Sequence, residues 1–263
     1  MDPPLLPHRG TVLIIPAVSS ANVPQLAADL LVHTLKIPFY SVLDHKGLLY
    51  PFAGPAELDR DPSSPATKLN GISSSLEVYH NAQFTVLILR SPTLPSSRGL
   101  FVSEVLMPLI HANDFSKILL LSSADATRKQ DPMSPRVLTL SVSNQSLQGG
   151  PTTILDLSRR IERFSVTDQP STPDYEEYPL PRRIPGSGIS VTVLREALKS
   201  NLPLSAIVLF AFDGDNIPDA TEMATMTLDI LDVAPHPEWQ YPLSWAGIYG
   251  KEQPIGMELG LYG

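Results

Sequence analysis

The stretch Thr11–Leu35 constrains the fold of this chain more than any other part of the sequence. Its first residues, Thr11–Ala17, are nearly all apolar, which is typical of a short strand covered on both faces. Pro24 suits the first turn of a following helix, and three polar side chains before it can cap that helix: Ser19, Ser20 and Asn22. Leucines then recur at helical spacing: Leu26, Leu30, Leu31 and Leu35. A buried strand joined tightly to an amphipathic helix predicts a layered α/β domain.

The composition is that of a globular protein, and it narrows the possible partners. The chain has 263 residues, of which 43% are hydrophobic and 17% are charged, enough for one sizeable core. The net charge of −8 argues against nucleic acid or an anionic membrane surface as a partner. The absence of cysteine excludes disulfides and Cys-ligated metals, and fits a reducing compartment. No apolar run reaches the roughly 20 residues of a membrane span, and the N-terminus lacks the order of a signal peptide. We therefore expect a soluble intracellular protein, located in the cytoplasm and also in the nucleus.

Four further apolar runs in the first half of the chain predict strands: Phe39–Leu43, Leu76–His80, Gln83–Arg90 and Lys117–Ser122. The second and third runs flank Asn81–Ala82 and predict a hairpin. Leu100–Ala112 has an apolar face at helical spacing, and Pro108 predicts a kink in that helix. The segment Asp44–Ser74 is rich in Pro, Gly and Ser, so it predicts a surface loop with at most a short strand around Leu48–Tyr50.

The second half of the chain begins irregularly and becomes regular later. Residues 124–181 are largely polar, acidic or Pro-rich, so we expect a mobile insertion there, within which Arg136–Val142 fits a strand. Ile189–Lys199 predicts a helix. Leu204–Phe212 is the most apolar run of the chain, and we expect it to be the central strand of the sheet.

One more helix follows that strand. Asp219 or Thr221 should cap it, and its apolar positions again follow the helical period: Met223, Met226, Ile230 and Leu231. Together the elements predict an α/β fold, a single domain over residues 1–263 with a mixed, mostly parallel β-sheet flanked by helices. The long irregular Pro-rich insertion at 124–181 and a flexible C-terminal tail at 251–263 complete this expectation.

The glycine-containing turn Ile184–Ile189 precedes a predicted helix. Gly186 and Gly188 permit a sharp turn, and backbone N–H groups at the start of a helix can hold an anion. The spacing matches neither a P-loop nor a dinucleotide-binding fingerprint. A plain structural turn is therefore the preferred interpretation, and an anion site is the alternative.

Other polar clusters match no recognised catalytic or metal-binding pattern. One acidic cluster lacks the ligand spacing of an EF-hand and suits a turn: Asp213, Asp215 and Asp219. Ser122, Ser123 and Asp125 follow a predicted strand, where α/β enzymes often place catalytic groups, but no G-x-S-x-G elbow accompanies them. The six histidines are scattered without ligand spacing. We therefore expect no catalytic residue, no cofactor and no metal.

The last three residues, Leu261, Tyr262 and Gly263, offer an apolar side chain, an amphipathic ring and a terminal carboxylate. These groups can dock together in a narrow pocket of a partner protein. Gly256 and Gly260 would give the tail reach. A frayed end is the alternative interpretation, because most chain termini are poorly ordered.

Three strings in the chain together resemble signatures of the proteasome assembly chaperone 2 family, in particular its fungal-type members. They are PAVSSANVPQLAADLLVHTL from Pro16, RIPGSGIS from Arg183 and GDNIPDA from Gly214. They occur in the family's order and at about its separations, and the strands between them fit as well. The resemblance covers most of the chain except Ala124–Pro181, where the longer Pro-rich segment departs from the family's compact pattern.

The resemblance implies a single α/β domain, loosely similar to nucleoside phosphorylases, without catalysis. It also implies a heterodimer with proteasome assembly chaperone 1 that sits on the α-ring of the proteasome core particle during assembly. In fungal-type members a C-terminal hydrophobic–Tyr–X tail enters a pocket between α subunits, and here that pattern falls on Leu261, Tyr262 and Gly263. The alternative function is an enzyme of nucleoside phosphorylase or hydrolase type, suggested by the glycine turn and by Ser122–Asp125.

Overall fold

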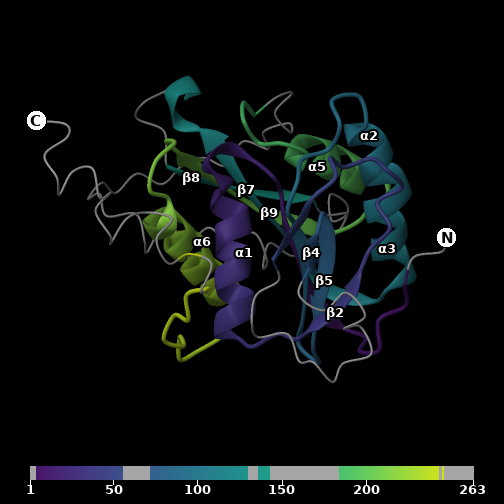
Figure 1. The fold of residues 1–263 in the computed structure, drawn as a ribbon, viewed down its shortest axis with the longest axis horizontal. Coiled ribbons are helices and arrows are strands. Elements are labelled where there is room, and N and C mark those ends of the chain that lie inside the picture. The colour runs from purple at the N-terminus through teal and green to yellow at the C-terminus, as the bar shows by residue number, and fades with distance from the viewer. Residues whose placement is uncertain (1–3, 56–71, 130–135, 143–183, 243–244, 246–263) are drawn as a thin grey trace, which may run out of the picture.

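The computed structural model describes residues 4–55, 72–129, 136–142, 184–242 and 245, and a seven-stranded sheet lies at its centre (Figure 1). The strand order is β2-β5-β6-β1-β7-β9-β8. The four inner strands from β6 to β9 run parallel: β6 (Phe84–Leu89), β1 (Thr11–Pro16), β7 (Phe115–Asp125) and β9 (Leu204–Ala211). The outer strands are antiparallel to their neighbours: β2 (Phe39–Val42), β5 (Leu76–His80) and β8 (Val137–Val142). The predicted mixed, mostly parallel sheet and its β5–β6 hairpin are confirmed.

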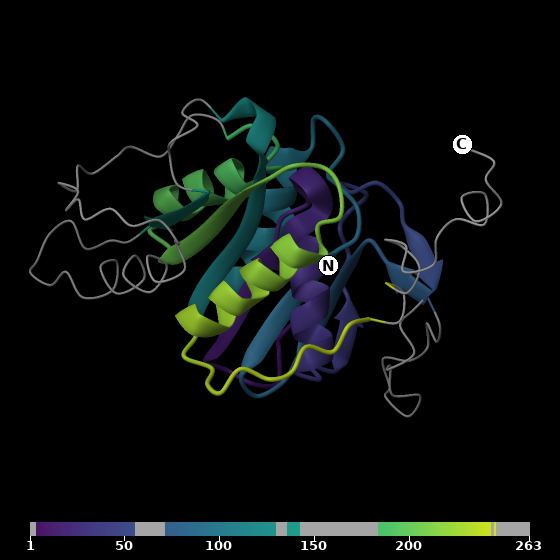
Figure 2. The ribbon, with the colours of Figure 1, turned by 90° about the vertical axis from the view of Figure 1, so that its left-hand side faces the viewer.

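Helices cover both faces of this sheet. One face carries α1 (Val23–Thr34) and α6 (Ile217–Ile230), which pack side by side (Figure 2). The opposite face carries three helical segments: α2 (Arg98–Phe101), α3 (Met107–Ala112) and α5 (Ser190–Lys199). Because helices cover both faces of the sheet, the inner strands can carry apolar side chains on both sides. The part of the chain that the structure describes contains no helix long and apolar enough to cross a membrane.

The seam between β1 and α1 forms as its sequence predicts. Leu13 and Ile15 face the α2–α3–α5 side and Ile14 faces α1, and all three are fully buried. Leu30 and Leu31 of α1 are also fully buried against this face. The predicted caps are wrong, because the helix accepts no side-chain cap from Asn22, while Ser19 and Ser20 bond to distant parts of the chain.

Two further expectations about the elements need correction. β9 is not the central strand but the second from the edge of the sheet. It is apolar because helices α5 and α6 pack on its two faces, not because it lies at the centre. The helix predicted over Leu100–Ala112 forms, but it contains one wide π-helical turn, η3 (Val102–Leu106), just before Pro108. Proline has no N–H for the preceding turn and its ring crowds the carbonyl four residues earlier, so a wider turn accommodates it.

The sequence missed a small second sheet made of β3 (Ala53–Pro55) and β4 (Ile72–Ser74). Strands of three residues are too short to show a hydrophobic alternation. Leu49, within the short strand expected at Leu48–Tyr50, forms an isolated bridge to Thr93. Within 124–181, β7 reaches Asp125, and β8 forms the strand expected at Arg136–Val142 and belongs to the main sheet. The rest of the expected insertion lies largely outside the described residues.

The N-terminal segment is tied to the sheet through a buried histidine. The backbone N–H of His8 donates to Nε2 of His80 (3.2 Å), so Nδ1 of His80 carries the proton and donates to Thr85 Oγ1 (2.9 Å). Thr85 in turn bonds Thr11 Oγ1 (2.8 Å). The His80 ring lies 5.3 Å from that of His8 and 5.7 Å from that of Tyr40. Burial, and then the charge of His8, lower the pKa of His80.

This arrangement predicts a loss of stability in mild acid. Below pH 6.5, the ordinary pKa of histidine, the unfolded chain takes up a proton that folded His80 resists, so the free energy of unfolding falls as the pH drops. The loss from one such group is at most about 1.4 kcal/mol per pH unit. Denaturant unfolding at about pH 7.5 and pH 5.5 measures it. His80→Asn keeps a donor near Thr85 without titrating and should flatten the pH dependence, whereas His111→Gln at an exposed site should not.

Candidate functional site

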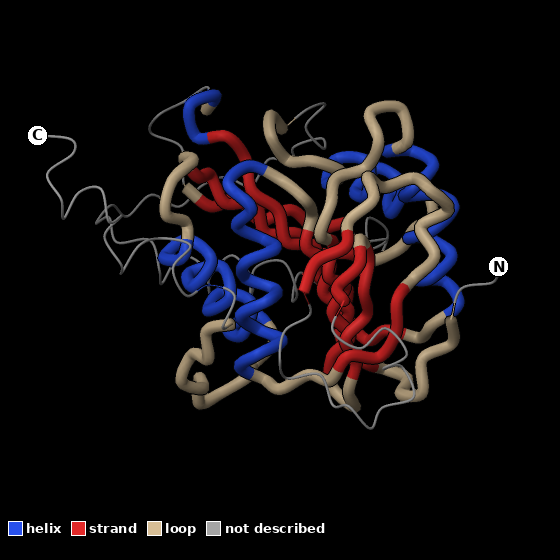
Figure 3. The backbone as a smooth tube through the Cα atoms, in the orientation of Figure 1, coloured by secondary structure: helices blue, strands red, loops and turns tan. Residues whose placement is uncertain are grey.

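The loops that carry the three sequence strings meet at one edge of the sheet, at the top in Figure 3. Parallel strands place their carboxyl ends at a common edge, and α/β proteins build their binding sites there. Val18–Asn22 follows β1, and 213–216 follows β9. The turn Ile184–Ile189 leads into α5 and packs against the first loop. This carboxyl edge is therefore the candidate functional site.

The glycine turn is fitted closely between the ends of β1 and β7. The N–H of Ser20 donates to the carbonyl of Gly186 (2.8 Å), and the N–H of Asp125 donates to that of Pro185 (3.1 Å). Gly186 has φ +81° and Gly188 has φ +60°, in the left-handed region. A Cβ atom on Gly188 would overlap the carbonyl oxygen of Val18. The preferred interpretation as a structural turn is thus sufficient to explain both glycines.

Buried serine hydroxyls join the same two strand ends. Ser19 Oγ and Ser123 Oγ lie 2.8 Å apart, and Ser123 Oγ donates to the carbonyl of Ser20 (2.5 Å). Ser190 Oγ, at the start of α5, donates to Ser122 Oγ (2.7 Å). Ser122 and Ser123 are fully buried. Their hydroxyls bond to other serines and to backbone, so these contacts hold the loops together and do not activate a nucleophile.

Asp125, the third of the strand-end catalytic candidates, has a structural role as well. Its carboxylate accepts the side-chain hydroxyl (2.5 Å) and the backbone N–H (2.9 Å) of Thr127. These hydrogen bonds, and then the charge of Arg128, hold the pKa of Asp125 below its usual value. A carboxyl group that stays ionised in this way is poorly suited to act as a general acid.

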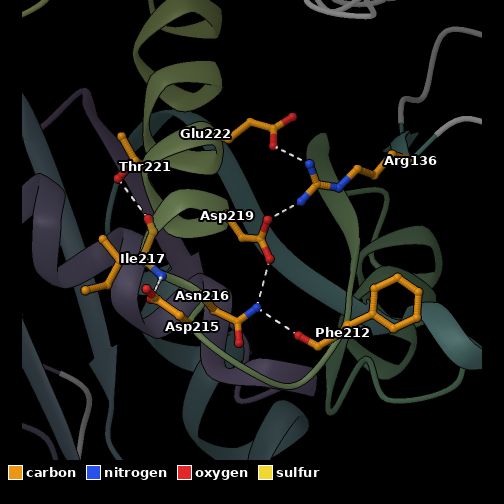
Figure 4. Close-up of polar contacts among 8 residues, drawn as sticks. All are labelled: Arg136, Phe212, Asp215, Asn216, Ile217, Asp219, Thr221 and Glu222. Atoms are coloured by element: carbon orange, nitrogen blue, oxygen red, sulfur yellow. Dashed lines mark hydrogen bonds and ion pairs between the residues drawn. The ribbon is translucent and has the colours of Figure 1, made fainter. Parts of the chain in front are cut away.

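Hydrogen bonds organise the acidic loop after β9 (Figure 4). Asp215 Oδ1 accepts the N–H of Ile217 (3.1 Å), while Asn216 donates to the carbonyl of Phe212 (2.9 Å) and to Asp219 Oδ2 (2.8 Å). The predicted cap by Asp219 or Thr221 is wrong, because α6 begins earlier, at Ile217. Among the described residues no three potential metal ligands gather at one place.

Arg136, just before β8, neutralises two carboxylates near the start of α6, next to this loop. Its guanidinium pairs with Asp219 and with Glu222 (2.8 Å), both on α6 (Figure 4). Sequence reasoning did not find this partner, because it lies on another element and far away along the chain. The interpretation of the aspartates as turn and cap residues holds for Asp215.

An open groove of about 560 Å³ lies on the outer side of the glycine turn. Two arginines from different helices line it, Arg98 of α2 and Arg195 of α5. Hydroxyl and apolar side chains complete the lining: Ser19, Ser187, Thr192, Val18, Ile184 and Val191. The sequence singled out the turn but neither arginine, because two isolated basic residues so far apart carry no recognisable spacing.

The predicted partner-binding residues Leu261, Tyr262 and Gly263 lie outside the described residues, as does the rest of the tail at 251–263. Their role stays a prediction. The rings of His8 and His80 lie 5.3 Å apart at a tilt of 31°, and no histidine in the described ranges belongs to a group of three potential metal ligands.

Comparison with known proteins gives end-to-end matches. Residues 13–225 match the model of the PAC2 family, a range that includes all three strings. Proteasome assembly chaperone 2 of Danio rerio is 30% identical over 257 residues, covering 94% of this chain and 94% of the relative. Proteasome assembly chaperone 2 of Saccharomyces cerevisiae is 25% identical over 273 residues, covering 95% and 98%. PbaA of Pyrococcus furiosus, an archaeal homolog of proteasome-assembly chaperone, has a TM-score of 0.56 at 16% identity, covering 88% of this chain and 86% of its own, and shares the fold.

Proposed function

The chain belongs to the PAC2 family, and from this premise we propose that it is a non-enzymatic chaperone for assembly of the proteasome core particle. The observation that carries the proposal is the match to proteasome assembly chaperone 2 of Danio rerio over 94% of both chains. A match over such a length includes the sheet, the helices on both faces and the loops at the carboxyl edge. The proposed place of action is the cytoplasm and also the nucleus.

The finer part of the proposal concerns partners. We propose that the chain forms a heterodimer with proteasome assembly chaperone 1, and that the pair binds the α-ring of the core particle. Leu261, Tyr262 and Gly263 would enter a pocket between two α subunits. The terminal carboxylate can pair with a lysine and the tyrosine ring can be buried, a combination typical of binding hot spots. No cofactor, metal, nucleic acid or membrane is part of this proposal.

The alternative, an enzyme of nucleoside phosphorylase or hydrolase type, receives no support from the strand-end residues. Ser122 and Ser123 are buried and bonded to other serines or to backbone, and Asp125 caps a turn. An enzyme site needs polar groups that converge on a space open to a substrate. The hydroxyls of Ser122 and Ser123 do not meet this requirement, because they are closed off from solvent and bonded to other serines or to backbone.

Deletion of Leu261–Gly263 tests the proposed tail. We expect binding to the α-ring to weaken at least about tenfold, because a carboxylate–lysine pair and a buried ring together contribute more than about 1.4 kcal/mol. The heterodimer and the unfolding temperature should not change. Surface plasmon resonance on immobilised α-rings measures the affinity. Glu258→Gln, which alters one charge in the tail but leaves its last three residues, is the matched control and should bind as the unaltered chain does. Equal affinity of the truncated and full chains would refute the role of the tail.

A further inference from the structure

The two edges of the main sheet differ in how well they are protected against pairing with another strand. We propose that the outer edge of β8 pairs with the β8 strand of a second copy of this chain, so that the two sheets join into one. This inference goes beyond the chaperone function and depends on neither the tail nor the heterodimer. It rests on three features of the described residues: the outward backbone groups of β8, its uncharged sequence, and its self-complementary register.

β8 lies at one end of the strand order and, within the described ranges, pairs only with β9. The N–H of Phe210 donates to the carbonyl of Arg136 (2.9 Å), and the register continues from this pair without a shift. In an antiparallel ladder, alternate residues turn their backbone groups to the same side. The residues whose backbone groups point to β9 are therefore Leu138, Leu140 and Val142. The residues whose backbone N–H and C=O groups point outward are Val137, Thr139 and Ser141.

The sequence of β8 does not prevent pairing at this edge. Edge strands of soluble proteins usually carry charged residues, proline, a bulge or a very short length, each of which blocks another strand. β2, at the opposite edge, is four residues long, follows Pro38, and shifts its register between Phe39 and Ser41. β8 has six residues, VLTLSV, with no charge, proline or glycine, and it pairs regularly with β9 throughout. A row of outward N–H and C=O groups is matched by the backbone of another strand, so the partner of β8 is a strand.

β8 is complementary to itself when two copies meet about a two-fold axis at Thr139. Thr139 then lies opposite Thr139 of the second copy, and Val137 of each copy lies opposite Ser141 of the other. Each of these pairs exchanges two backbone hydrogen bonds. Leu138 of one copy lies opposite Leu140 of the other, and both leucines belong to the apolar layer on the α5 face of the sheet. Threonine pairs and apolar pairs are favourable across strands, so the side chains agree with the backbone register.

The charges around β8 also favour a second copy as the partner. Arg136 precedes the strand, and its guanidinium is held by Asp219 and Glu222 of the same chain. A charged strand opposite β8 would leave its charge unpaired, which is costly where water is excluded. The β8 strand of a second copy carries no charge and therefore fits. The β2 edge of a second copy fits less well, because its bulge interrupts the ladder.

Sedimentation velocity of the full chain alone, in about 0.15 M salt and at about 1 to 500 μM protein, tests the proposal. We expect a reversible equilibrium between monomer and dimer. Thr139→Pro removes an N–H that points away from β9, so it should weaken the dimer at least about tenfold while the sheet stays intact. Thr139→Val keeps this N–H and should change the dissociation constant less than about threefold. Thermal unfolding followed by circular dichroism checks that both variants are folded.

A charge exchange at the same position tests the register without proline. Thr139→Lys and Thr139→Glu should each weaken the dimer, because two like charges then face each other across the axis. An equal mixture of the two variants should restore it, because a lysine then faces a glutamate.

A cysteine at Thr139 reports the contact directly, because the chain contains no other cysteine. The Cα atoms of a hydrogen-bonded antiparallel pair lie about 5.5 Å apart, a distance that a disulfide spans. With oxidised glutathione as the oxidant, Thr139→Cys should therefore form a disulfide-linked dimer. The control is Ser103→Cys, at an exposed position of η3, which should form this dimer at least about tenfold more slowly.

The proposal is overturned if the unaltered chain stays a monomer up to about 500 μM. It is also overturned if Thr139→Pro dimerises as well as Thr139→Val, or if the mixed Lys and Glu variants stay monomeric, because any dimer would then use another surface. Slow hydrogen exchange of the Thr139 amide in the monomer would overturn it as well, since the chain itself would then cover this edge. All of these measurements use the chain alone, so none of their outcomes decides the chaperone function.

Discussion

Replacing Asp29 with alanine is expected to lower the free energy of unfolding by about 3–5 kcal/mol, because it removes one partner of a buried ion pair. Asp29 lies on α1 and Arg90 directly follows β6, so the pair fastens the helix to the sheet. The atoms Arg90 Nη1 and Asp29 Oδ2 are 2.7 Å apart. The two side chains are only 18% and 13% exposed, so little water can reach Arg90 to replace the lost carboxylate.

In the Asp29→Ala variant, deprotonation of Arg90 cannot reduce the cost of leaving its charge unpaired. Burial alone would lower its pKa, but the charge and hydrogen bond of Asp29, followed by the charge of Glu77, outweigh burial and raise the pKa further above its ordinary value. The guanidinium therefore stays charged at every accessible pH. Glu77 is itself fully buried. Arg90→Ala should consequently be at least as destabilising as Asp29→Ala, because it removes the cation that faces two carboxylates.

Urea unfolding of both variants, monitored by circular dichroism, measures the effect. The matched control is the pair of Lys46, in the loop after β2, and Glu104 of η3, whose charged atoms lie 3.5 Å apart and whose side chains are 40% and 49% exposed. Lys46→Ala should cost less than about 1 kcal/mol, and this small effect should vanish at high salt. If Asp29→Ala and Lys46→Ala lower the free energy of unfolding by similar amounts, burial does not strengthen the ion pair between Arg90 and Asp29.

The sequence predicted the elements well wherever burial shapes the hydrophobic pattern directly. The apolar runs predicted β1, β5 and β6 correctly, and the leucine spacing predicted α1. A buried face requires apolar residues at the fixed period of a strand or a helix. The same signal says little about strand order. β9 is the most apolar run and yet lies second from the edge, since its two faces are covered as fully as those of β1.

Long-range contacts explain what the sequence could not provide about the candidate site. Ser19 and Ser20 look like helix caps, but their partners are Ser123 and Gly186, more than a hundred residues away. Asp219 likewise looked like a cap, but it pairs with Arg136. A local rule assigns the local role because only the fold reveals the competing partner. The sequence predicted the glycine turn. It could not predict that Arg98 and Arg195 lie beside this turn, because they come together only when α2 and α5 pack on the same face of the sheet.

The glycine turn itself gives the second large prediction. Gly188→Ala is expected to lower the free energy of unfolding by about 3–5 kcal/mol, from two additive causes. The left-handed backbone at φ +60° disfavours any Cβ, and here the Cβ would also overlap the carbonyl oxygen of Val18. A backbone carbonyl cannot rotate away as a side chain can. The loop after β1 would therefore shift and strain the hydrogen bond from Ser20 N–H to Gly186.

Gly10→Ala separates these two causes. Gly10 has φ +70°, but nothing lies within 4 Å of the position of its Cβ, so the substitution should cost only the left-handed strain of about 1–2 kcal/mol. Thermal and urea unfolding of both variants should therefore differ by about 2 kcal/mol or more. If the two alanines cost the same, the close approach between the turn and the end of β1 contributes nothing.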